Sequence, residues 1–228
     1  MIYVTGDTHG DPTRFSADTL EDSAWTKEDY LIVCGDFGYV FADSLEERDF
    51  LDWLERTKPY TVCFCDGNHE NFAVLNDPAR FRKELWHGGY VHRIRRNVVH
   101  LMRGQVFDID GKTVFSMGGA YSIDRALRRL NESYWEEEIP CDGEYREALQ
   151  NLKEHGHRVD IVVTHTAPRE IIRRMGKYPD VHDMELTGFL EWVMYEMNFG
   201  HWYFGHWHRD EDVTDRVTAV FYDVHPVA

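Results

Sequence analysis

The sequence has few cysteines and no long apolar run, and both absences narrow what the chain can be. Its four cysteines, Cys34, Cys63, Cys65 and Cys141, show neither C-x-x-C spacing nor the density of a secreted disulfide scaffold. We therefore expect reduced thiols. No apolar run reaches membrane-spanning length, and the opening MIYVTGDTHG lacks the charged and apolar segments of a secretory signal. From these features we expect a cytoplasmic protein without a membrane partner.

Basic residues are also scarce. The chain has 25 Lys and Arg against 41 Asp and Glu, which gives a net charge of -16. Such a charge repels long polyanions, so an extended nucleic-acid interface is not expected. No stretch rich in Pro, Ser or Gly marks a linker, and no internal repeat is visible. The length of 228 residues fits a single domain spanning 1–228.

The pattern of apolar residues predicts a mixed α/β fold. Ser44 and Glu47 form a capping box that predicts a helix ending near Arg56. Helical spacing also covers 144–155 and 186–197, and Asp110-Gly111 joins two alternating runs as a β-hairpin. Short β-branched and aromatic runs predict strands at 2–5, 30–34, 61–65, 160–164, 201–204 and 218–224.

Polar side chains follow five of these strands, at the edge where ligands bind in α/β folds. Glycines flank four of the five groups and permit sharp turns there. The candidate residues are Asp7 and His9 in GDTHG, Asp36 in CGDFG, Asn68 and His69 in DGNHE, His165 in VVTHTAP, and His206 and His208 in GHWH. Each residue alone has an ordinary structural explanation as a helix cap, a turn residue or a surface histidine. Their joint occurrence at successive strand ends favours a shared site.

The chemistry of this set suits divalent cations. It contains two carboxylates, an amide oxygen and several imidazoles but no thiolate, which matches ions that prefer nitrogen and oxygen ligands. One ion cannot use all of these groups. If one carboxylate bridges, the set divides between two ions, which lie about 3.5 to 4 Å apart in known two-metal sites.

The order of the motifs, D-x-H, GD, GNH[DE], a single His after a strand and GHxH, resembles the calcineurin-like metallophosphoesterase superfamily, especially its small microbial members. The resemblance implies a four-layer α/β/β/α sandwich with a dinuclear metal site at the carboxyl ends of the strands. It implies catalytic roles for His69, Asp36 and Asn68, with His69 contacting the phosphate or protonating the leaving group. The ligand sets it implies are Asp7, His9 and His208 for one ion, Asn68, His165 and His206 for the other, and Asp36 as the bridge.

The second motif departs from one branch of that superfamily. GDFGYV lacks the second aspartate and the arginine of the GDxVDRG motif in protein serine/threonine phosphatases, which argues against a phosphoprotein substrate. Arginines can grip phosphate oxygens in a fork, and three of them follow GGAYSID. Arg125, Arg128 and Arg129 are therefore candidates for substrate binding, with a solvated helix face as the alternative.

The expected function is hydrolysis of a phosphate mono- or diester by direct attack of a metal-bridging hydroxide. We expect two divalent ions, with Mn²⁺ first and Fe, Zn²⁺, Ni²⁺ or Co²⁺ as alternatives. A small phosphoester is the expected substrate, because the negative net charge disfavours long polyanions. Two other functions remain open at this stage: a nuclease or cyclic-nucleotide phosphodiesterase of the same fold, and a catalytically silent metal-binding scaffold.

Overall fold

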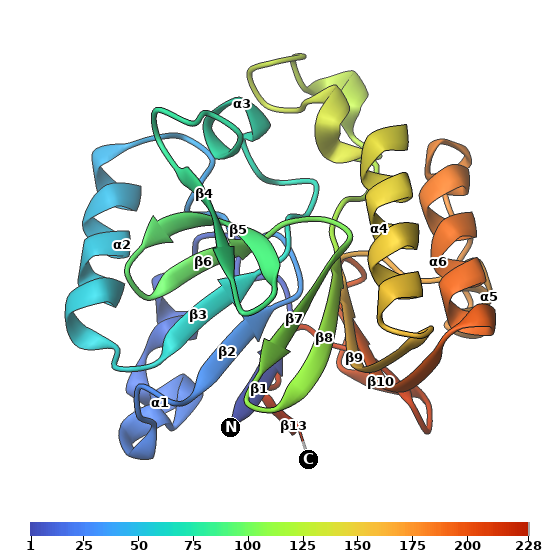
Figure 1. Cartoon of the computed structure of the whole chain (residues 1–228). Helices are drawn as coiled ribbons and strands as arrows, with labels where there is room; N and C mark the ends of the chain where they lie inside the picture. Colours follow the sequence, from blue (N-terminus) through green and yellow to red (C-terminus); the bar gives the residue numbers. More distant parts are fainter. Residues whose placement is uncertain (228) are drawn as a thin grey trace.

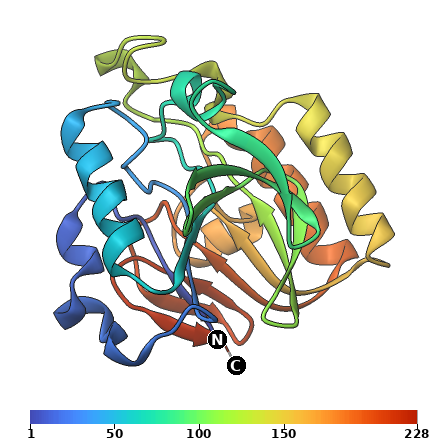
Figure 2. The same cartoon turned by 60° about the vertical axis from the view of Figure 1, so that its left-hand side comes forward.

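The computed structural model describes residues 1–227 and contains two mixed β-sheets. In the first, sheet A, seven strands have the order β13-β1-β2-β3-β6-β5-β4. These strands are β1 (Ile2–Thr5), β2 (Tyr30–Val33), β3 (Thr61–Phe64), β4 (Arg82–Trp86), β5 (Gly89–Arg95), β6 (Val98–Leu101) and β13 (His225–Val227). Strands β1, β2, β3 and β6 are parallel, so their carboxyl ends lie at one edge. The first and last strands pair with each other and lie side by side in Figures 1 and 2.

The second sheet, sheet B, has six strands in the order β11-β12-β10-β9-β8-β7. They are β7 (Gln105–Ile109), β8 (Lys112–Met117), β9 (Arg158–Thr164), β10 (Asn198–Phe204), β11 (Glu211–Thr214) and β12 (Val217–Ala219). Strands β8, β9, β10 and β12 are parallel, and the outer strands are antiparallel. The predicted hairpin is confirmed: Ile109 pairs with Lys112, and Asp110 and Gly111 both have the positive φ that a two-residue turn requires.

Helices cover the outer face of each sheet (Figure 1). The α-helices are α1 (Ala17–Leu20), α2 (Leu45–Thr57), α3 (Phe72–Leu75), α4 (Asp142–Glu154), α5 (Arg169–Arg174) and α6 (Met184–Glu196). Short 3-10 helices span Pro12–Phe15, Asp22–Ala24, Arg125–Leu127, Glu136–Glu138 and Val181–Asp183. The predicted capping box of α2 is confirmed, because the Glu47 backbone N–H donates to Ser44 Oγ at 3.2 Å. All three predicted helices are present, with small shifts of their ends.

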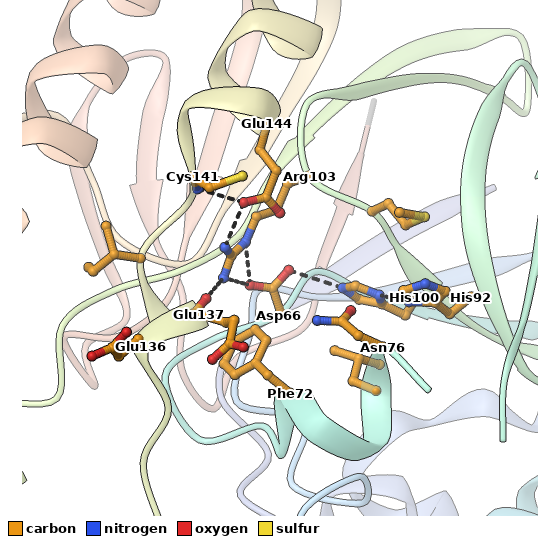
Figure 3. A pocket seen from close by; sticks show the side chains of 13 residues that line it. Asp66, Phe72, Asn76, His92, His100, Arg103, Glu136, Glu137, Cys141 and Glu144 are labelled. Carbon is orange, nitrogen blue, oxygen red and sulfur yellow. Dashed lines mark hydrogen bonds and ion pairs between the residues drawn. The ribbon is translucent and has the colours of Figure 1, made fainter. Parts of the chain in front are cut away.

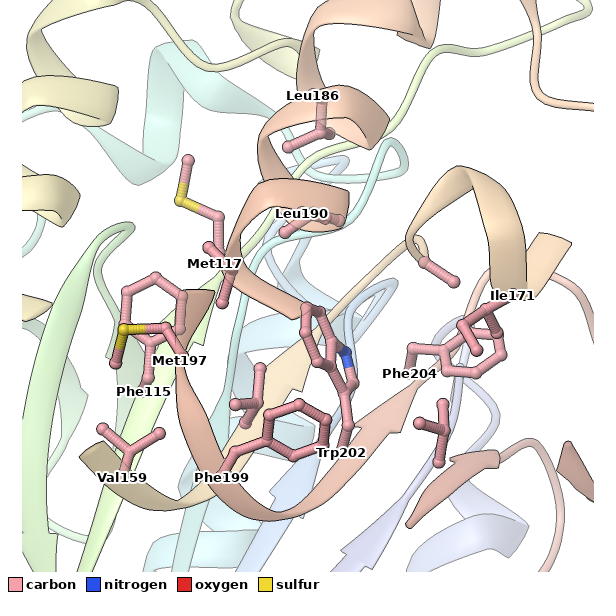
Figure 4. Packing of buried hydrophobic residues seen from close by; sticks show 14 of the residues in the cluster. Phe115, Met117, Val159, Ile171, Leu186, Leu190, Met197, Phe199, Trp202 and Phe204 are labelled. Atoms are coloured by element: carbon pink, nitrogen blue, oxygen red, sulfur yellow. The ribbon is translucent and has the colours of Figure 1, made fainter. Parts of the chain in front are cut away.

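Three separate groups of buried apolar side chains correspond to the three interfaces of a four-layer α/β/β/α sandwich. Leu31 and Val33 face α2 on the outer side of sheet A, where Leu51 and Leu54 pack against the sheet. Alternate residues of the same strands, such as Ile32, face sheet B. The third group joins sheet B to α4, α5 and α6, and Figure 4 shows Trp202, Phe199 and Phe115 in it beneath Leu186 and Leu190 of α6. The predicted fold class is confirmed.

The fold differs from the prediction in several places, including strands β11 and β13 and helices α1, α3 and α5, which were not predicted. The run 218–224 is not one strand: β12 ends at Ala219, because the Asp210 carboxylate accepts hydrogen bonds from the backbone N–H groups of Phe221, Tyr222 and Asp223 at 2.7, 2.9 and 3.1 Å. Strands β4, β5 and β6 were not predicted, and in β4 and β5 charged side chains interrupt the apolar pattern. Arg93 and Arg95 in β5 are instead neutralised by ion pairs with Glu84 and Asp52.

Candidate metal centre

The candidate residues converge at one edge of the sandwich, as their positions after the strands predict. Asp7 follows β1, Asp36 follows β2 and Asn68 follows β3, while His165 follows β9 of the other sheet. The carboxyl ends of parallel strands meet at the same sheet edge, and the two sheets face each other there (Figure 1). Residues 201 positions apart are thereby brought into contact, since His208 Nε2 lies 3.2 Å from Asp7 Oδ2.

Four of these residues have an uncommon backbone conformation. His9, Asp36, His206 and His208 have φ values of 47°, 49°, 68° and 49°, in the left-handed region that side chains with a Cβ rarely occupy. Local hydrogen bonds hold part of this geometry: the Asp36 carbonyl accepts from the N–H of Thr8 at 3.1 Å and of His9 at 2.8 Å. Residues held in such conformations cluster at functional sites, where the surrounding structure fixes them.

Glycine is required where the loops approach the two carboxylates. A Cβ on Gly205 would lie 2.2 Å from Asp7 Oδ1, and a Cβ on Gly67 would lie 2.0 Å from Asp36 Oδ1. Both are far below van der Waals contact, so only glycine permits this approach. The glycines that flank the motifs therefore bring the backbone against the ligand-bearing side chains.

Asp7, His9 and His208 form the first of two groups. The Nε2 atoms of the two histidines are 3.0 Å apart, and His9 Nε2 is 3.8 Å from Asp7 Oδ2. The potential ligand atoms of this trio all lie within 4.8 Å of one another. The backbone N–H of His206 donates to both Asp7 oxygens, at 3.0 and 3.1 Å, which fixes the carboxylate. These three side chains could hold one divalent ion.

The second group contains three hydrogen-bond acceptors that face one another. His165 Nδ1 lies 2.9 Å from the Cys34 carbonyl, which accepts only if Nδ1 carries the proton, so Nε2 is left with a lone pair. Asn68 Nδ2 donates to Ser122 Oγ at 3.0 Å, which turns Asn68 Oδ1 toward His165 Nε2, 3.0 Å away. Asp36 Oδ1 lies 3.4 Å from the same Nε2. Three converging acceptors repel one another unless a proton or a cation lies between them.

Asp36 lies between the two groups. Its Oδ1 faces His165 in the second group, and its Oδ2 is 3.8 Å from His9 Nδ1 in the first. A backbone N–H from His69 donates to Oδ1 at 2.8 Å. The ring of His206 lies 4.9 Å from that of His165 and completes the second group. The arrangement matches a bridging carboxylate, although the ligand roles themselves stay a prediction.

The family comparison agrees with this geometry. The family model described as calcineurin-like phosphoesterase matches residues 1–210. The chain belongs to this family. Its members are hydrolases that act on phosphoester bonds and depend on metal ions, typically two divalent ions. A search of curated proteins gave no match. Within residues 1–227, no helix is both long and apolar enough to cross a bilayer.

The electrostatics of this calcineurin-like phosphoesterase favour the neutral imidazole, the form that binds metals, at His9, His165 and His206, whereas the hydrogen bond to Asp7 raises the pKa of His208. Burial lowers the pKa of His206 to about 3, and it lowers the pKa values of His165 and His9 as well. Burial, with the nearby charges of Asp7 and Glu70, raises the pKa of Asp36 well above its usual value. The buried Asp36 carboxylate therefore lacks compensating positive charge, which divalent ions would supply.

A cavity of about 690 Å³ opens beside these residues. Its lining includes Asp36, Asn68, His69, His206 and His208. Burial, aided by the positive charge of Arg128, lowers the pKa of His69 to about 4, so the free ring is neutral at pH 7. His69 is thus at the cavity wall and within reach of a bound ester rather than enclosed in either ligand group.

The three candidate arginines have different positions. Arg128 lines the cavity, and its Nη2 lies 3.2 and 3.0 Å from the two ring nitrogens of His69. Arg125 instead forms an ion pair with the buried Glu138 at 2.9 Å, and Arg129, with a side chain 82 % exposed, lies outside the cavity lining. Only Arg128 of the three is placed beside the candidate metal ligands.

Sequence reasoning missed a buried ionic network behind the Asn68 loop. Asp66 Oδ2 binds Arg103 Nη2 at 2.6 Å, and Asp66 Oδ1 contacts His100 Nε2 at 3.0 Å (Figure 3). Arg103 also reaches Glu144 of α4 at 3.3 Å, and a second cavity of about 540 Å³ adjoins the network. The Asp in CDGNHE was the available signal, but nothing local in the sequence identifies its partners. This network holds the loop that carries Asn68 against α4 and β6.

Proposed function

We propose that the chain is a phosphoesterase that uses two divalent ions, held by Asp7, His9 and His208 on one side and by Asn68, His165 and His206 on the other, with Asp36 between them. The observation that carries this proposal is the convergence of Asn68 Oδ1 and Asp36 Oδ1 on His165 Nε2, at 3.0 and 3.4 Å. We propose Mn²⁺ as the first ion to test, since the ligands are nitrogen and oxygen atoms only.

The bound ions would activate water and neutralise the charge on the phosphoryl oxygens. Two divalent ions add about +4 against about -2 from the carboxylates, so the centre attracts an anion although the chain carries -16. Side chains of the protein would supply the remaining contacts with the phosphoryl group. In this proposal, Arg128 Nη2 donates to a phosphoryl oxygen. Arg128 Nε donates to the Asp124 carboxylate at 2.8 Å, and this hydrogen bond orients the guanidinium.

His69 is the proposed partner of the leaving oxygen. Its ring lies between Arg128 and the two ligand groups, with a centroid 5.4 Å from that of His9. Burial, together with the charge of the neighbouring Arg128 guanidinium, holds the pKa of His69 low in the free site, and a bound phosphate dianion would offset the guanidinium charge and favour the protonated ring. A protonated His69 could then donate to the departing alkoxide, whereas water attacks phosphorus directly and no covalent enzyme intermediate forms.

The test is metal removal and restoration. Chelation should abolish hydrolysis of a chromogenic phosphate monoester, Mn²⁺ should restore it, and Asp36→Asn should lose nearly all turnover while remaining folded by circular dichroism. Parallel assays with a phosphate diester separate a phosphatase from a phosphodiesterase or nuclease. Two outcomes contradict the proposal: full activity after metal removal, or two bound ions per chain with no turnover of any ester.

A further inference from the structure

The cavity beside the metal centre is larger than a phosphoryl group requires. The cavity has a volume of about 690 Å³. Candidate metal ligands form its floor, and two segments, 121–128 and 177–183, form its walls. The cavity therefore has room for a substrate that extends from the reacting phosphorus toward these walls. Their chemistry indicates what the rest of the substrate is.

Apolar side chains stand exposed on both walls. Ile123 on one segment is 80 % exposed, and Tyr178 and Val181 on the other are 85 % and 73 % exposed. Exposed apolar groups that gather at a functional cavity mark a binding surface more often than scattered ones do. Tyr178 has no ring-stacking partner among residues 1–227, whereas the ring of Tyr121 already stacks on His182 with centroids 4.3 Å apart. The Tyr178 ring is therefore open to a ligand.

The charges on these walls do not favour further phosphate groups. Two cations, Arg128 and Lys177, are outnumbered by three carboxylates, Asp124, Asp180 and Asp183. Arg128 is already paired with Asp124 at 2.8 Å. A second phosphate or a polynucleotide strand would meet no excess positive charge beyond the metal centre. An uncharged group needs no such positive charge on the cavity walls.

We propose that the ester group of the substrate carries an uncharged aromatic ring, which Ile123, Tyr178 and Val181 contact while the phosphoryl group binds at the metal centre and Arg128. This inference rests on the proposed phosphoesterase function. The three apolar residues thereby become determinants of specificity. They contact the ring but not the reacting atoms, so they act on the choice of substrate.

The experiment compares 2-phenylethyl phosphate with ethyl phosphate in the Mn²⁺-loaded full-length protein. Both esters release a primary alcohol of similar acidity, so the comparison isolates binding of the ring from leaving-group reactivity. Burial of a phenyl ring should raise kcat/KM at least roughly tenfold for the aromatic ester. The double variant Tyr178→Ala/Val181→Ser should reduce this ratio to about twofold or less. Leu45→Ala, which removes an exposed apolar side chain at the start of α2, should leave the ratio unchanged.

The possible results separate this inference from the function on which it rests. Equal kcat/KM for the two esters, or an undiminished ratio in the double variant, overturns the aromatic preference while metal-dependent hydrolysis still stands. If no phosphate monoester or diester is hydrolysed with any metal, the phosphoesterase proposal itself fails.

Discussion

The buried ion pair between Asp66 and Arg103 allows a quantitative test of how the Asn68 loop is held. Their side chains are 1 % and 4 % exposed, and the guanidinium donates to Asp66 Oδ2 through Nε at 2.8 Å and Nη2 at 2.6 Å (Figure 3). Arg103→Met keeps most of the apolar volume but leaves Asp66 as a buried charge with His100 as its remaining ring partner. Breaking a buried pair in this way costs about 3 to 5 kcal/mol.

The lower end of that range is expected here. The cavity of about 540 Å³ next to the pair can admit water to Asp66 in the variant, which recovers part of the lost solvation. We therefore expect a loss of about 3 kcal/mol in the free energy of unfolding. With a urea m-value of about 2 to 3 kcal/mol/M, the unfolding midpoint should fall by on the order of 1 M. Urea titration followed by tryptophan fluorescence measures this, in metal-free protein so that ion binding does not contribute.

The pH dependence of the stability loss in Arg103→Met should identify the buried Asp66 charge as its cause. In the native chain, burial tends to raise the pKa of Asp66, but Arg103 and His100 hold it well below its usual value. The pair therefore stabilises the fold above the unfolded pKa of about 4, and that stability is lost only as the pH falls through the lower native value. Without Arg103, burial dominates and the native pKa rises. The deficit of the variant should then be largest at pH 8 and should shrink toward pH 5.5, where protonation neutralises Asp66.

Two control variants complete the test. Asp66→Asn combined with Arg103→Met removes both charges and should recover much of the loss, because replacing both partners of a buried pair is often nearly neutral. Arg129→Met removes an exposed pair with Glu132 at 3.5 Å and should change stability by less than about 0.5 kcal/mol. A loss below about 1 kcal/mol for Arg103→Met, constant between pH 5.5 and 8, would refute the reasoning.

Two further predictions concern the cavity walls. Arg128→Ala should lower kcat/KM for a phosphate monoester by about 10²-fold or more, as for loss of one donor to a developing charge, whereas Arg129→Ala should change it less than about twofold in the same steady-state assay. Equal effects of the two would remove Arg128 from phosphate binding. Burial raises the pKa of Asp183 to about 6, so the native chain binds this proton more tightly than the unfolded chain and loses stability as the pH rises from about 4 through 6. Asp183→Asn keeps the acceptor for the Tyr121 N–H and should stabilise the fold by up to about 3 kcal/mol at pH 8 but little at pH 4. Chemical denaturation at both pH values measures this, and equal gains at pH 4 and pH 8 would contradict it.

The candidate site could be predicted from sequence because each side chain follows its strand directly. Asp7 and Asp36 come immediately after an apolar run and a glycine, so the parallel order of β1 and β2 is enough to bring them together. The network behind them could not be predicted in this way. Asp66 lies 37 residues from Arg103 and 34 from His100, and only the pairing of β3 with β6 brings these residues close. The choice among the three arginines depended on one 3-10 turn, Arg125–Leu127, which directs Arg125 and Arg128 to different partners.

The same features that make the site suitable for cations make it costly to fold without them. His9, Asp36, His206 and His208 hold left-handed backbone conformations, each of which costs of order 1 kcal/mol or more in a residue with a Cβ. Asp7 and Asp36 are both buried within 4.8 Å of His165, and their charges oppose each other, since Asp7 helps to raise the pKa of Asp36. Divalent ions would relieve this repulsion directly and would fix the histidines in the conformations they already hold. The rigid sheets on either side, with their separate apolar interfaces, supply the stability that lets such a strained and like-charged edge persist before any ion binds.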